Sequence, residues 1–353
     1  MNISAEHEKY MRRCMELASK GLGRTAPNPL VGCVIVHKNR IIGEGYHRLF
    51  GGPHAEVMAI SCVQDLSVLL DSALYVNLEP CPHFGKTPPC VDLISEKGIP
   101  LVVAGTIDPN PIVAGKGIQI LKEKGIRVIS DVLKSECVQL NKRFFTFHRK
   151  KRPYIILKWA QTKDNFIDLT RKENGAGRIT WITDEASRRL VHKWRAEEQA
   201  ILVGSRTVVM DNPRLTTRNW PGNSPIRLVI DRKGILSGNL HILDDSAETV
   251  IFTFVPKQDQ THLRYFKLEK DKDIISTVLE YLYDKNIQSL IVEGGKLLID
   301  EFLRHNTWDE ARVFTGNITF RDGITAPLIQ YEPINLIEFS ESILNIYKNP
   351  DSY

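Results

Sequence analysis

Apolar and polar positions in the first 150 residues switch repeatedly between helical and strand-like spacing. Tyr10, Cys14 and Leu17 recur at helical spacing, which predicts a helix over residues 4–20. Shorter apolar runs bounded by Gly, Pro and Asn then alternate with helical patterns. The predicted strands are 31–36, 40–44, 73–78, 101–105 and 126–129, and the other predicted helices are 54–62, 90–97 and 117–124. This order predicts an α/β/α sandwich.

The pattern restarts after residue 153 and again alternates strands with helices. The predicted strands are 154–159, 200–203, 226–231, 250–254 and 289–293, and the predicted helices are 185–196, 274–285 and 297–306. Residues 256–273 and the tail beyond about residue 331 show no pattern. The second half is therefore also predicted to be α/β.

A dense basic stretch, KRFFTFHRKKR at 142–152, stands between the halves. Interleaved basic and aromatic residues can bind RNA, but a charged linker whose phenylalanines dock on a neighbouring domain is the simpler interpretation. Two domains, residues 1–150 and 151–353, also suit a chain of 353 residues.

Composition and charge exclude several classes of protein. With 42% hydrophobic and 25% charged residues and scattered Gly and Pro, disordered, collagen-like and coiled-coil proteins are excluded. No apolar run approaches the roughly 18 residues of a membrane span, and the amino terminus lacks the apolar segment of a secretion signal. We expect a soluble, cytoplasmic protein without a membrane partner.

The net charge of +5 is concentrated in the first half. Residues 1–150 hold 19 Lys and Arg together against 14 Asp and Glu. Residues 151–353 hold 28 basic and 28 acidic residues. This excess suits an anionic small substrate as well as it suits RNA. An RNA-editing enzyme with an RNA-binding second domain would need a basic second half, so we expect no nucleic-acid partner.

Four residues in the first half form a candidate metal centre. His54 and Glu56 open the predicted helix 54–62, Cys81 follows the predicted strand 73–78, and Cys90 stands eight intervening residues later. One imidazole and two thiolates can hold Zn²⁺ with a fourth position open to water, which the metal acidifies. Glu56 can then transfer the proton of that water. We predict His54, Cys81 and Cys90 as zinc ligands, Glu56 as the catalytic residue and the other four cysteines as bystanders.

This arrangement resembles the zinc-dependent nucleobase deaminases, whose pattern is H-x-E followed by P-C-x-x-C. Here eight residues separate the cysteines instead of two. The resulting loop, CPHFGKTPPC at 81–90, together with PNPLVG at 27–32, GEGYH at 43–47 and DPNP at 108–111, is similar to the deaminase of riboflavin biosynthesis. The resemblance implies hydrolytic deamination of a diaminopyrimidinone that carries a ribosylamino 5-phosphate.

The same resemblance implies substrate contacts in the first domain. Lys86 is the candidate for the phosphate, and Asn28, His47 and Asn110 are candidates for hydrogen bonds to the base or sugar. Asn beside Pro is also a common turn residue, so a purely structural role for Asn28 and Asn110 stays open.

Two glycine-containing junctions between strand and helix stand out in the second half, ILVGSRT at 201–207 and LIVEGGK at 290–296. A phosphate can approach the backbone closely at glycine, and the following helix offers free N–H groups. Phosphate binding and tight packing of the turns are both open on the residues alone.

Longer stretches are similar to the reductase domain that follows this deaminase in the bacterial bifunctional enzyme. They include RPYIILKWA at 152–160, WIT at 181–183, AILVG at 200–204, DNPRLTTR at 211–218 and VEGG at 292–295. That reductase resembles dihydrofolate reductase in fold and uses NADPH. The resemblance implies reduction of the ribosylamino side chain to ribitylamino.

The resemblance also assigns ligand contacts in the second domain. The expected NADPH contacts are Gln161, Trp181, Thr207, Asp211, Gly295 and Lys296. The expected substrate contacts are Arg195, Leu215, Arg218 and Glu293. Two arginines suit bidentate recognition of the ribose phosphate. A homo-oligomer, either a dimer or a tetramer, is likewise implied by the family.

Two departures from the reductase pattern keep an alternative open. Asn165 stands where the family has glycine after its first strand, although Asn tolerates positive φ. Ile179 stands where the family can have a substrate-binding serine. A second domain that only assists assembly is therefore one alternative. A non-enzymatic zinc module is disfavoured, because no fourth ligand stands at a suitable spacing.

Overall fold

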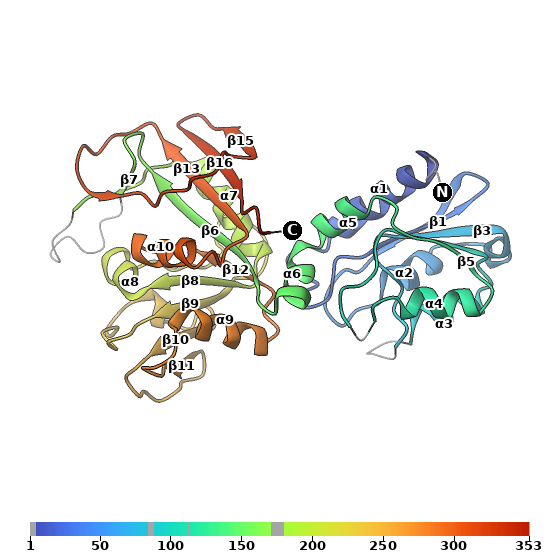
Figure 1. Ribbon diagram of the computed structural model, residues 1–353, viewed down its shortest axis with the longest axis horizontal. Coiled ribbons are helices and arrows are strands. Elements are labelled where there is room, and N and C mark those ends of the chain that lie inside the picture. Colours follow the sequence, from blue (N-terminus) through green and yellow to red (C-terminus); the bar gives the residue numbers. More distant parts are fainter. Residues whose placement is uncertain (1–4, 84–87, 112, 171–179, 353) are drawn as a thin grey trace. The chain divides into compact units, whose positions relative to one another are not determined.

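The chain forms two compact units, Met1–Lys151 (unit 1) and Arg152–Tyr353 (unit 2). The computed structural model describes residues 5–83, 88–111, 113–170 and 180–352 (Figure 1). Both units are built from sheets flanked by helices, so the predicted α/β class is confirmed. In the described residues, no helix is both long and apolar enough to cross a membrane.

Unit 1 is organised around a five-stranded sheet of order β2-β1-β3-β4-β5. Strand β1 pairs antiparallel with β2 and β3, whereas β3, β4 and β5 are parallel. The strands are β1 (Gly32–His37), β2 (Arg40–Tyr46), β3 (Ser72–Val76), β4 (Leu101–Ala104) and β5 (Arg127–Ile129). The helices are α1 (Ala5–Ser19), α2 (Ala55–Ser61), η1 (Leu66–Asp71), α3 (Cys90–Glu96), α4 (Lys116–Glu123), α5 (Lys134–Leu140) and α6 (Lys142–Lys150).

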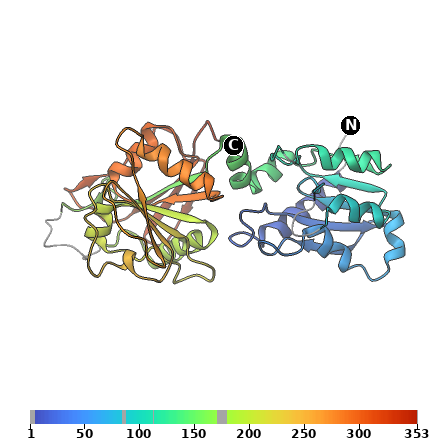
Figure 2. The same cartoon turned by 90° about the horizontal axis from the view of Figure 1, so that it is seen from below.

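Helices cover both faces of this sheet (Figures 1 and 2). Helices α1 and α5 pack on one face through a cluster that includes Met11 and Cys137. Helices α2, α3 and α4 cover the other face through a cluster that includes Ala59 and Leu121. Because successive strand residues point to opposite faces, the short buried strands contribute to both clusters.

Unit 2 contains a nine-stranded sheet of order β11-β10-β9-β8-β12-β6-β13-β16-β15. Its strands are β6 (Tyr154–Gln161), β8 (Ala200–Gly204), β9 (Ile226–Ile230), β10 (Thr249–Thr253), β11 (Leu263–Lys267), β12 (Ser289–Val292), β13 (Glu310–Gly316), β15 (Asn335–Glu338) and β16 (Ser342–Lys348). A separate ribbon pairs β7 (Phe166–Asp168) with β14 (Ile324–Thr325). The helices are α7 (Glu185–Glu197), α8 (Ser205–Asp211), η3 (His241–Leu243), α9 (Ile274–Asp284) and α10 (Lys296–Arg304).

The two faces of this larger sheet are covered by different helix pairs. Trp194 of α7 and Val208 of α8 belong to the cluster on one face. Val278 of α9 and Phe302 of α10 belong to the cluster on the other. Strands β6, β8 and β12 lie next to one another at the centre, are parallel and are almost wholly apolar. Their carboxyl ends therefore meet at one edge of the sheet.

The structure differs from the sequence predictions in several regions, and helix α5 and strands β7, β13 and β14 have no counterpart among the predicted elements. Residues 142–150 form helix α6 rather than a linker, and its Phe144 and Phe145 are buried with Leu78 inside unit 1. Strands β11, β15 and β16 lie where no pattern is visible. All four residues of β15 are exposed, so this strand lacks the apolar face that produces an alternating pattern.

Candidate functional sites

The three predicted zinc ligands converge in unit 1. His54 is the N-cap of α2, Cys90 is the first residue of α3, and Cys81 lies in the segment after β3. The Nδ1 atom of His54 lies 3.4 Å from the Sγ of Cys81 and 3.3 Å from the Sγ of Cys90. Ligand atoms bound about 2.0–2.3 Å from a tetrahedral Zn²⁺ are about 3.5 Å apart. The donor set therefore fits zinc in both chemistry and spacing.

Electrostatics in this metal centre favour a thiolate. Hydrogen bonds from Cys90 lower the pKa of Cys81 to about 4, and His54 contributes in the same direction. The backbone N–H of Cys90 donates to the Cys81 Sγ at 3.4 Å. Among the described residues, these three form the group that can hold a metal ion.

Glu56 lies on the first turn of α2, two residues after the ligand His54. Its side chain is only 3% exposed, and burial raises the pKa of its carboxyl group. A carboxyl group with a raised pKa can both accept and release a proton closer to neutral pH. The predicted general acid and base is therefore buried beside the ligand cluster.

His47 and Asn28 also lie together near the metal centre. The Nδ1 of His47 contacts the Pro53 carbonyl at 3.0 Å, and its Nε2 contacts the Asn28 amide nitrogen at 3.1 Å. Nδ1 must then carry the proton, because Nε2 accepts from the amide N–H. Burial lowers the pKa of His47, which agrees with a neutral ring. The ring lies edge-on to that of His54, with 5.7 Å between centroids.

Glu79, which sequence reasoning missed, organises the loop that contains Asn110. Its carboxylate accepts hydrogen bonds from the backbone N–H groups of Asp108, Gly115 and Ile118 at 2.9–3.1 Å. The Asn110 N–H in turn donates to the Asp108 Oδ1 at 2.7 Å. The Asp108 side chain thus fixes the turn through the backbone of Asn110, and the substrate contact of the Asn110 side chain stays a prediction. The signal that the sequence offers is an acidic residue directly before the Pro-Cys pair.

The last predicted contact of unit 1 is Lys86. Lys86 lies outside the described residues.

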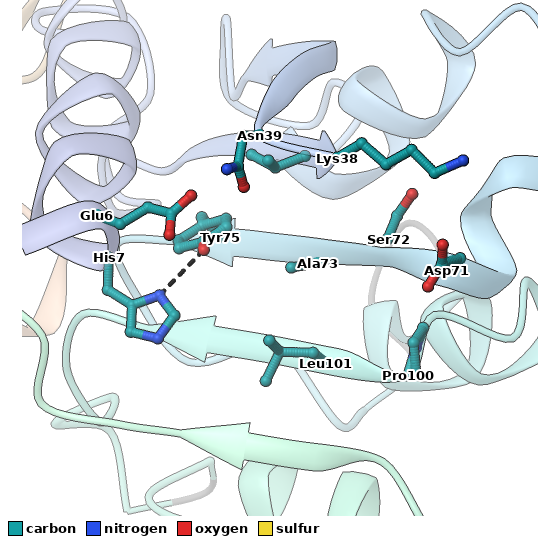
Figure 3. Close-up of a pocket in the computed structure, with 11 residues that line it drawn as sticks. Glu6, His7, Lys38, Asn39, Asp71, Ser72, Ala73, Tyr75, Pro100 and Leu101 are labelled. Atoms are coloured by element: carbon teal, nitrogen blue, oxygen red, sulfur yellow. Dashed lines mark hydrogen bonds between the residues drawn. The ribbon is translucent and has the colours of Figure 1, made fainter. Parts of the chain in front are cut away.

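A hollow of about 320 Å³ is lined by His7, Lys38, Tyr75 and Leu101, among others (Figure 3). It lies where β3 and β4 begin, whereas Cys81 follows the other end of β3. The hollow is therefore separate from the metal centre.

Unit 2 contains a buried charged cluster at the carboxyl end of β12. Glu293 accepts two hydrogen bonds from Arg195 of α7, at 3.1 and 2.8 Å, and its Oε2 lies 3.6 Å from the Nζ of Lys158 on β6. Burial alone would raise the pKa of Glu293, but Arg195 and Lys158 lower it to about 2. Lys158 was not predicted as a site residue, because its only signal was a charge inside an apolar strand.

The segment 211–218 follows α8 and lies beside this cluster. Arg195 donates to the Thr216 carbonyl at 3.4 Å, and Arg218 donates to the Thr216 hydroxyl at 3.1 Å. The Arg218 backbone N–H donates to the Nδ1 of His192 at 3.2 Å. Burial lowers the pKa of His192 to about 4, helped by the nearby arginines. Leu215 is 3% exposed, so its side chain belongs to the core.

Several expected NADPH contacts meet where β8 and β12 end. A Cβ added at Gly294 would lie 2.8 Å from Val203, so only glycine fits there. Gly295 has φ +50°, and its added Cβ would lie 3.2 Å from the Thr207 hydroxyl. Lys296 begins α10 and pairs with Asp300 at 3.0 Å. The close backbone approach and the open helix terminus fit a dinucleotide phosphate.

Gln161, Trp181 and Asp211 are the other expected NADPH contacts, and each has its own set of neighbours. Gln161 accepts from Trp159 at 2.8 Å and donates to Asn165 at 3.0 Å. Asn165 has φ +63°, so the turn that usually contains glycine is retained. Trp181 is 59% exposed and lies against the Arg188 guanidinium, 4.7 Å from the ring centroid. Asp211 is the last residue of α8. Ile179 lies outside the described residues.

Two protein families match the sequence. The cytidine and deoxycytidylate deaminase zinc-binding region matches residues 4–106, and the RibD C-terminal domain matches residues 153–335. The riboflavin biosynthesis protein RibD of Bacillus amyloliquefaciens is 41% identical over 334 residues, which cover 92% of this chain and 88% of the relative. The chain belongs to the RibD family. It is a bifunctional deaminase and reductase of riboflavin biosynthesis with a zinc-binding deaminase region.

Solved structures of RibD proteins agree with the fold over both units. A diaminohydroxyphosphoribosylaminopyrimidine deaminase/5-amino-6-(5-phosphoribosylamino)uracil reductase from Thermotoga maritima has a TM-score of 0.88 and 40% identity, and the match covers 98% of this chain and 99% of that one. Acinetobacter baumannii RibD has a TM-score of 0.86 and 30% identity, with 97% and 98% covered. The RibD family thus accounts for the presence of both a deaminase region and a reductase domain in one chain, and the reductase domain implies NADPH.

Proposed function

We propose that the two units catalyse consecutive steps on one phosphorylated pyrimidine. Residues 1–150 would deaminate 2,5-diamino-6-ribosylamino-4(3H)-pyrimidinone 5′-phosphate hydrolytically, and residues 151–353 would reduce the ribosylamino group of the product to ribitylamino with NADPH. The observation that carries the proposal is the convergence of one imidazole nitrogen and two sulfurs beside the buried Glu56.

In the deaminase unit, His54, Cys81 and Cys90 would hold the zinc ion. Bound there, Zn²⁺ would lower the pKa of a water molecule enough to make hydroxide available as the nucleophile near neutral pH. Glu56 would carry both protons of this water, the first to the ring nitrogen and the second from the new C–OH group to the departing amine, so that N=C–NH₂ and water become HN–C=O and NH₃.

The neutral His47 supports substrate binding beside this centre. Its Nε2 accepts from the Asn28 amide and so orients the Asn28 carbonyl oxygen. That oxygen would accept a hydrogen bond from the pyrimidine, while Lys86 would bind the phosphate. Asn110 would contact the substrate from the loop that Glu79 holds.

In the reductase unit, residues from three elements would surround the reacting side chain. NADPH supplies the hydride for C1 of the opened ribose. Lys158, Arg195 and Glu293 would hold the pyrimidine and ribose through their paired charges. Gln161, Trp181, Thr207, Asp211, Gly295 and Lys296 would bind the cofactor.

Arg218 is the stronger candidate for the phosphate of the reductase substrate. Arg195 is already held by the Glu293 carboxylate, 2.8 Å away. Arg218 is exposed, and in the described part of the chain no carboxylate pairs with it. A guanidinium without a counter-ion can engage a phosphate bidentately, and Leu215 would contribute through its main chain. We further propose that the protein acts in the cytoplasm as a homo-oligomer, without nucleic acid.

Separate readouts of the two products test this function. The purified chain is incubated with the pyrimidinone phosphate and NADPH, and ammonia release and NADPH oxidation are recorded independently, with and without a zinc chelator. We expect both reactions. Chelation should stop ammonia release but spare the oxidation of NADPH by added deaminated substrate. Ammonia release without NADPH oxidation would contradict the reductase assignment alone.

A further inference from the structure

The segment 211–218 has a backbone that needs external support. It contains three expected ligand contacts, yet two of its non-glycine residues are in the left-handed region, Asn212 at φ +41° and Leu215 at φ +56°. Asn adopts this region readily, and Asn212 is the left-handed C-cap of α8. A bulky residue such as Leu215 is unfavourable there and persists only where surrounding contacts hold it. The contacts that hold this segment therefore determine where Arg218 lies.

On the side of the charged cluster, the supports are residues of α7. Arg195 and His192 bind the Thr216 carbonyl and the Arg218 N–H, respectively. These contacts hold only the second half of the segment. The backbone N–H of Asn212 ties the first half to α8 by donating to the Val208 carbonyl at 2.9 Å, and the Asn212 side chain is free to contact another element.

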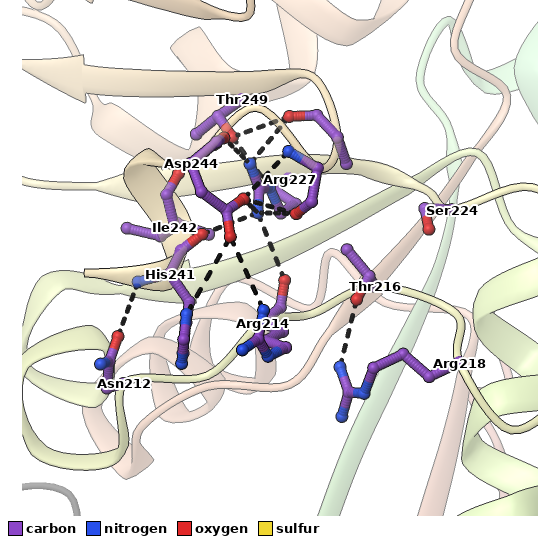
Figure 4. Close-up of polar contacts among 12 residues, drawn as sticks. Asn212, Arg214, Thr216, Arg218, Ser224, Arg227, His241, Ile242, Asp244 and Thr249 are labelled. Carbon is purple, nitrogen blue, oxygen red and sulfur yellow. Dashed lines mark hydrogen bonds and ion pairs between the residues drawn. The ribbon is translucent and has the colours of Figure 1, made fainter. Parts of the chain in front are cut away.

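On the opposite side, the support is the turn 241–247 (Figure 4). The backbone N–H of His241 donates to the Asn212 Oδ1 at 2.8 Å. Arg227 of β9 reaches the Arg214 carbonyl with a long contact of 3.5 Å, and the Arg214 guanidinium lies 3.9 Å from Asp244. The shortest of these contacts is made by the Asn212 side chain.

The turn 241–247 is itself held by the buried Arg227. This side chain is 0% exposed and donates to Thr249 at 2.9 Å, to Asp244 at 2.9 Å and to the Ala247 carbonyl at 2.8 Å. A buried guanidinium is unfavourable unless its N–H groups are satisfied, as they are here. The His241 N–H is therefore presented from a rigid support.

We propose that Asn212 is a positioning residue of the reductase: its side chain couples the segment 211–218 to the turn held by Arg227 and so places Arg218 for the substrate phosphate. This rests on the proposed reductase function. Asn212 acts through Arg218 and touches no reacting atom. Loss of the coupling should weaken binding of the phosphorylated substrate more than it slows hydride transfer.

The two ends of the hydrogen bond can be removed separately. Asn212→Gly keeps a residue that tolerates positive φ but removes the acceptor. His241→Pro removes the backbone donor together with the imidazole, and the backbone accepts proline because His241 is the first residue of η3 and Leu240 has ψ 134°, which suits a residue before proline. With the deaminated substrate, each variant should raise the reductase KM about fivefold, the equivalent of one hydrogen bond, with kcat changed less than twofold. The double variant should show no further increase.

Two matched controls exclude local strain and loss of the imidazole. Asn286→Gly makes the same change at an exposed residue with φ +56° in unit 2, and His241→Ala keeps the backbone N–H. Neither should change KM. Tryptophan emission, which comes from unit 2 alone, calibrates the amount of folded reductase unit in each variant.

Four results would overturn the proposal. They are an unchanged KM in Asn212→Gly, an equal increase in Asn286→Gly, additive effects in the double variant, or a lowered kcat at constant KM, which indicates fewer folded molecules. A wild-type chain that oxidises no NADPH would instead overturn the reductase function, and this inference with it.

Discussion

The metal centre of unit 1 and the charged cluster of unit 2 are both polar and largely shielded from solvent, but the chain assembles them differently. His54 and Cys90 are 36 positions apart, and both stand at helix starts in one half of the chain. Arg195 and Glu293 are 98 positions apart, and the cluster is completed by Lys158 from a third element. The first site follows from a compact motif, whereas the second exists only after the sheet of unit 2 has formed.

The two sites also differ in their charge balance. In unit 1, three ligand atoms face one another and gain a common partner only when a cation binds. In unit 2, the Glu293 carboxylate already lies between two cations. The first cluster is thus built around a metal ion, whereas the second is electrostatically satisfied by its own residues. Substitutions should therefore affect mainly chemistry in unit 1 and both stability and chemistry in unit 2.

The largest expected effect is that of Glu56→Gln on deamination. The amide cannot transfer the proton, so ammonia release should fall by about 10²–10⁴-fold. Zinc content, measured by elemental analysis, and NADPH oxidation with deaminated substrate should stay at the wild-type level. Ammonia release within tenfold of wild type would remove Glu56 from its role, and a loss of zinc would mean that Glu56 supports the metal.

The second effect is a pH-dependent loss of stability in Glu293→Gln. The pKa of Glu293 is about 2 in the folded chain, below its ordinary value of 4.5. Its contribution to folding is therefore complete above about pH 4.5 and is lost as the pH falls towards 2. At pH 7 the substitution leaves Arg195 and Lys158 without a counter-ion, which should destabilise unit 2 by on the order of 3 kcal/mol.

Tryptophan fluorescence can measure this loss in the intact chain. All five tryptophans are in unit 2, so their emission during urea unfolding reports on that unit alone. The difference between wild type and Glu293→Gln should be largest at pH 7 and shrink below pH 4.5. A difference that is the same at pH 7 and pH 3 would show that the carboxylate charge is not the cause. Ammonia release should be unaffected throughout.

The smallest expected effect is that of Cys62→Ser. Cys62 is exposed and lies outside the ligand cluster, so zinc content and both activities should match wild type. Cys81→Ser is the matched variant and should lose zinc and ammonia release, because it removes one of the three ligands. A chain that loses zinc on Cys62→Ser but keeps it on Cys81→Ser would show that the wrong thiols were chosen.

The sequence predicts features that depend on residues close together along the chain better than contacts between residues on separate strands. The ligands and Glu56 are recognisable because helix starts and the strand end bring nearby residues together. Lys158 was missed because a lysine in an apolar strand reveals nothing of its partner on another strand. The sequence predicts a linker in place of helix α6, because the basic residues of this stretch outnumber the buried Phe144 and Phe145 and obscure its apolar face. Strand β15 was missed because its residues are all exposed.

The sequence alone determined the α/β class, the metal-ligand set with its neighbouring acid, and membership of a family of bifunctional enzymes. These properties depend on local periodicity and on residue types at short spacing. Only the tertiary structure decided that His47 holds Asn28, that Glu79 holds the loop of Asn110 and that Glu293 lies between Arg195 and Lys158. Such pairings depend on which strands become neighbours and which helices cover them, and residue order along the chain does not express that adjacency.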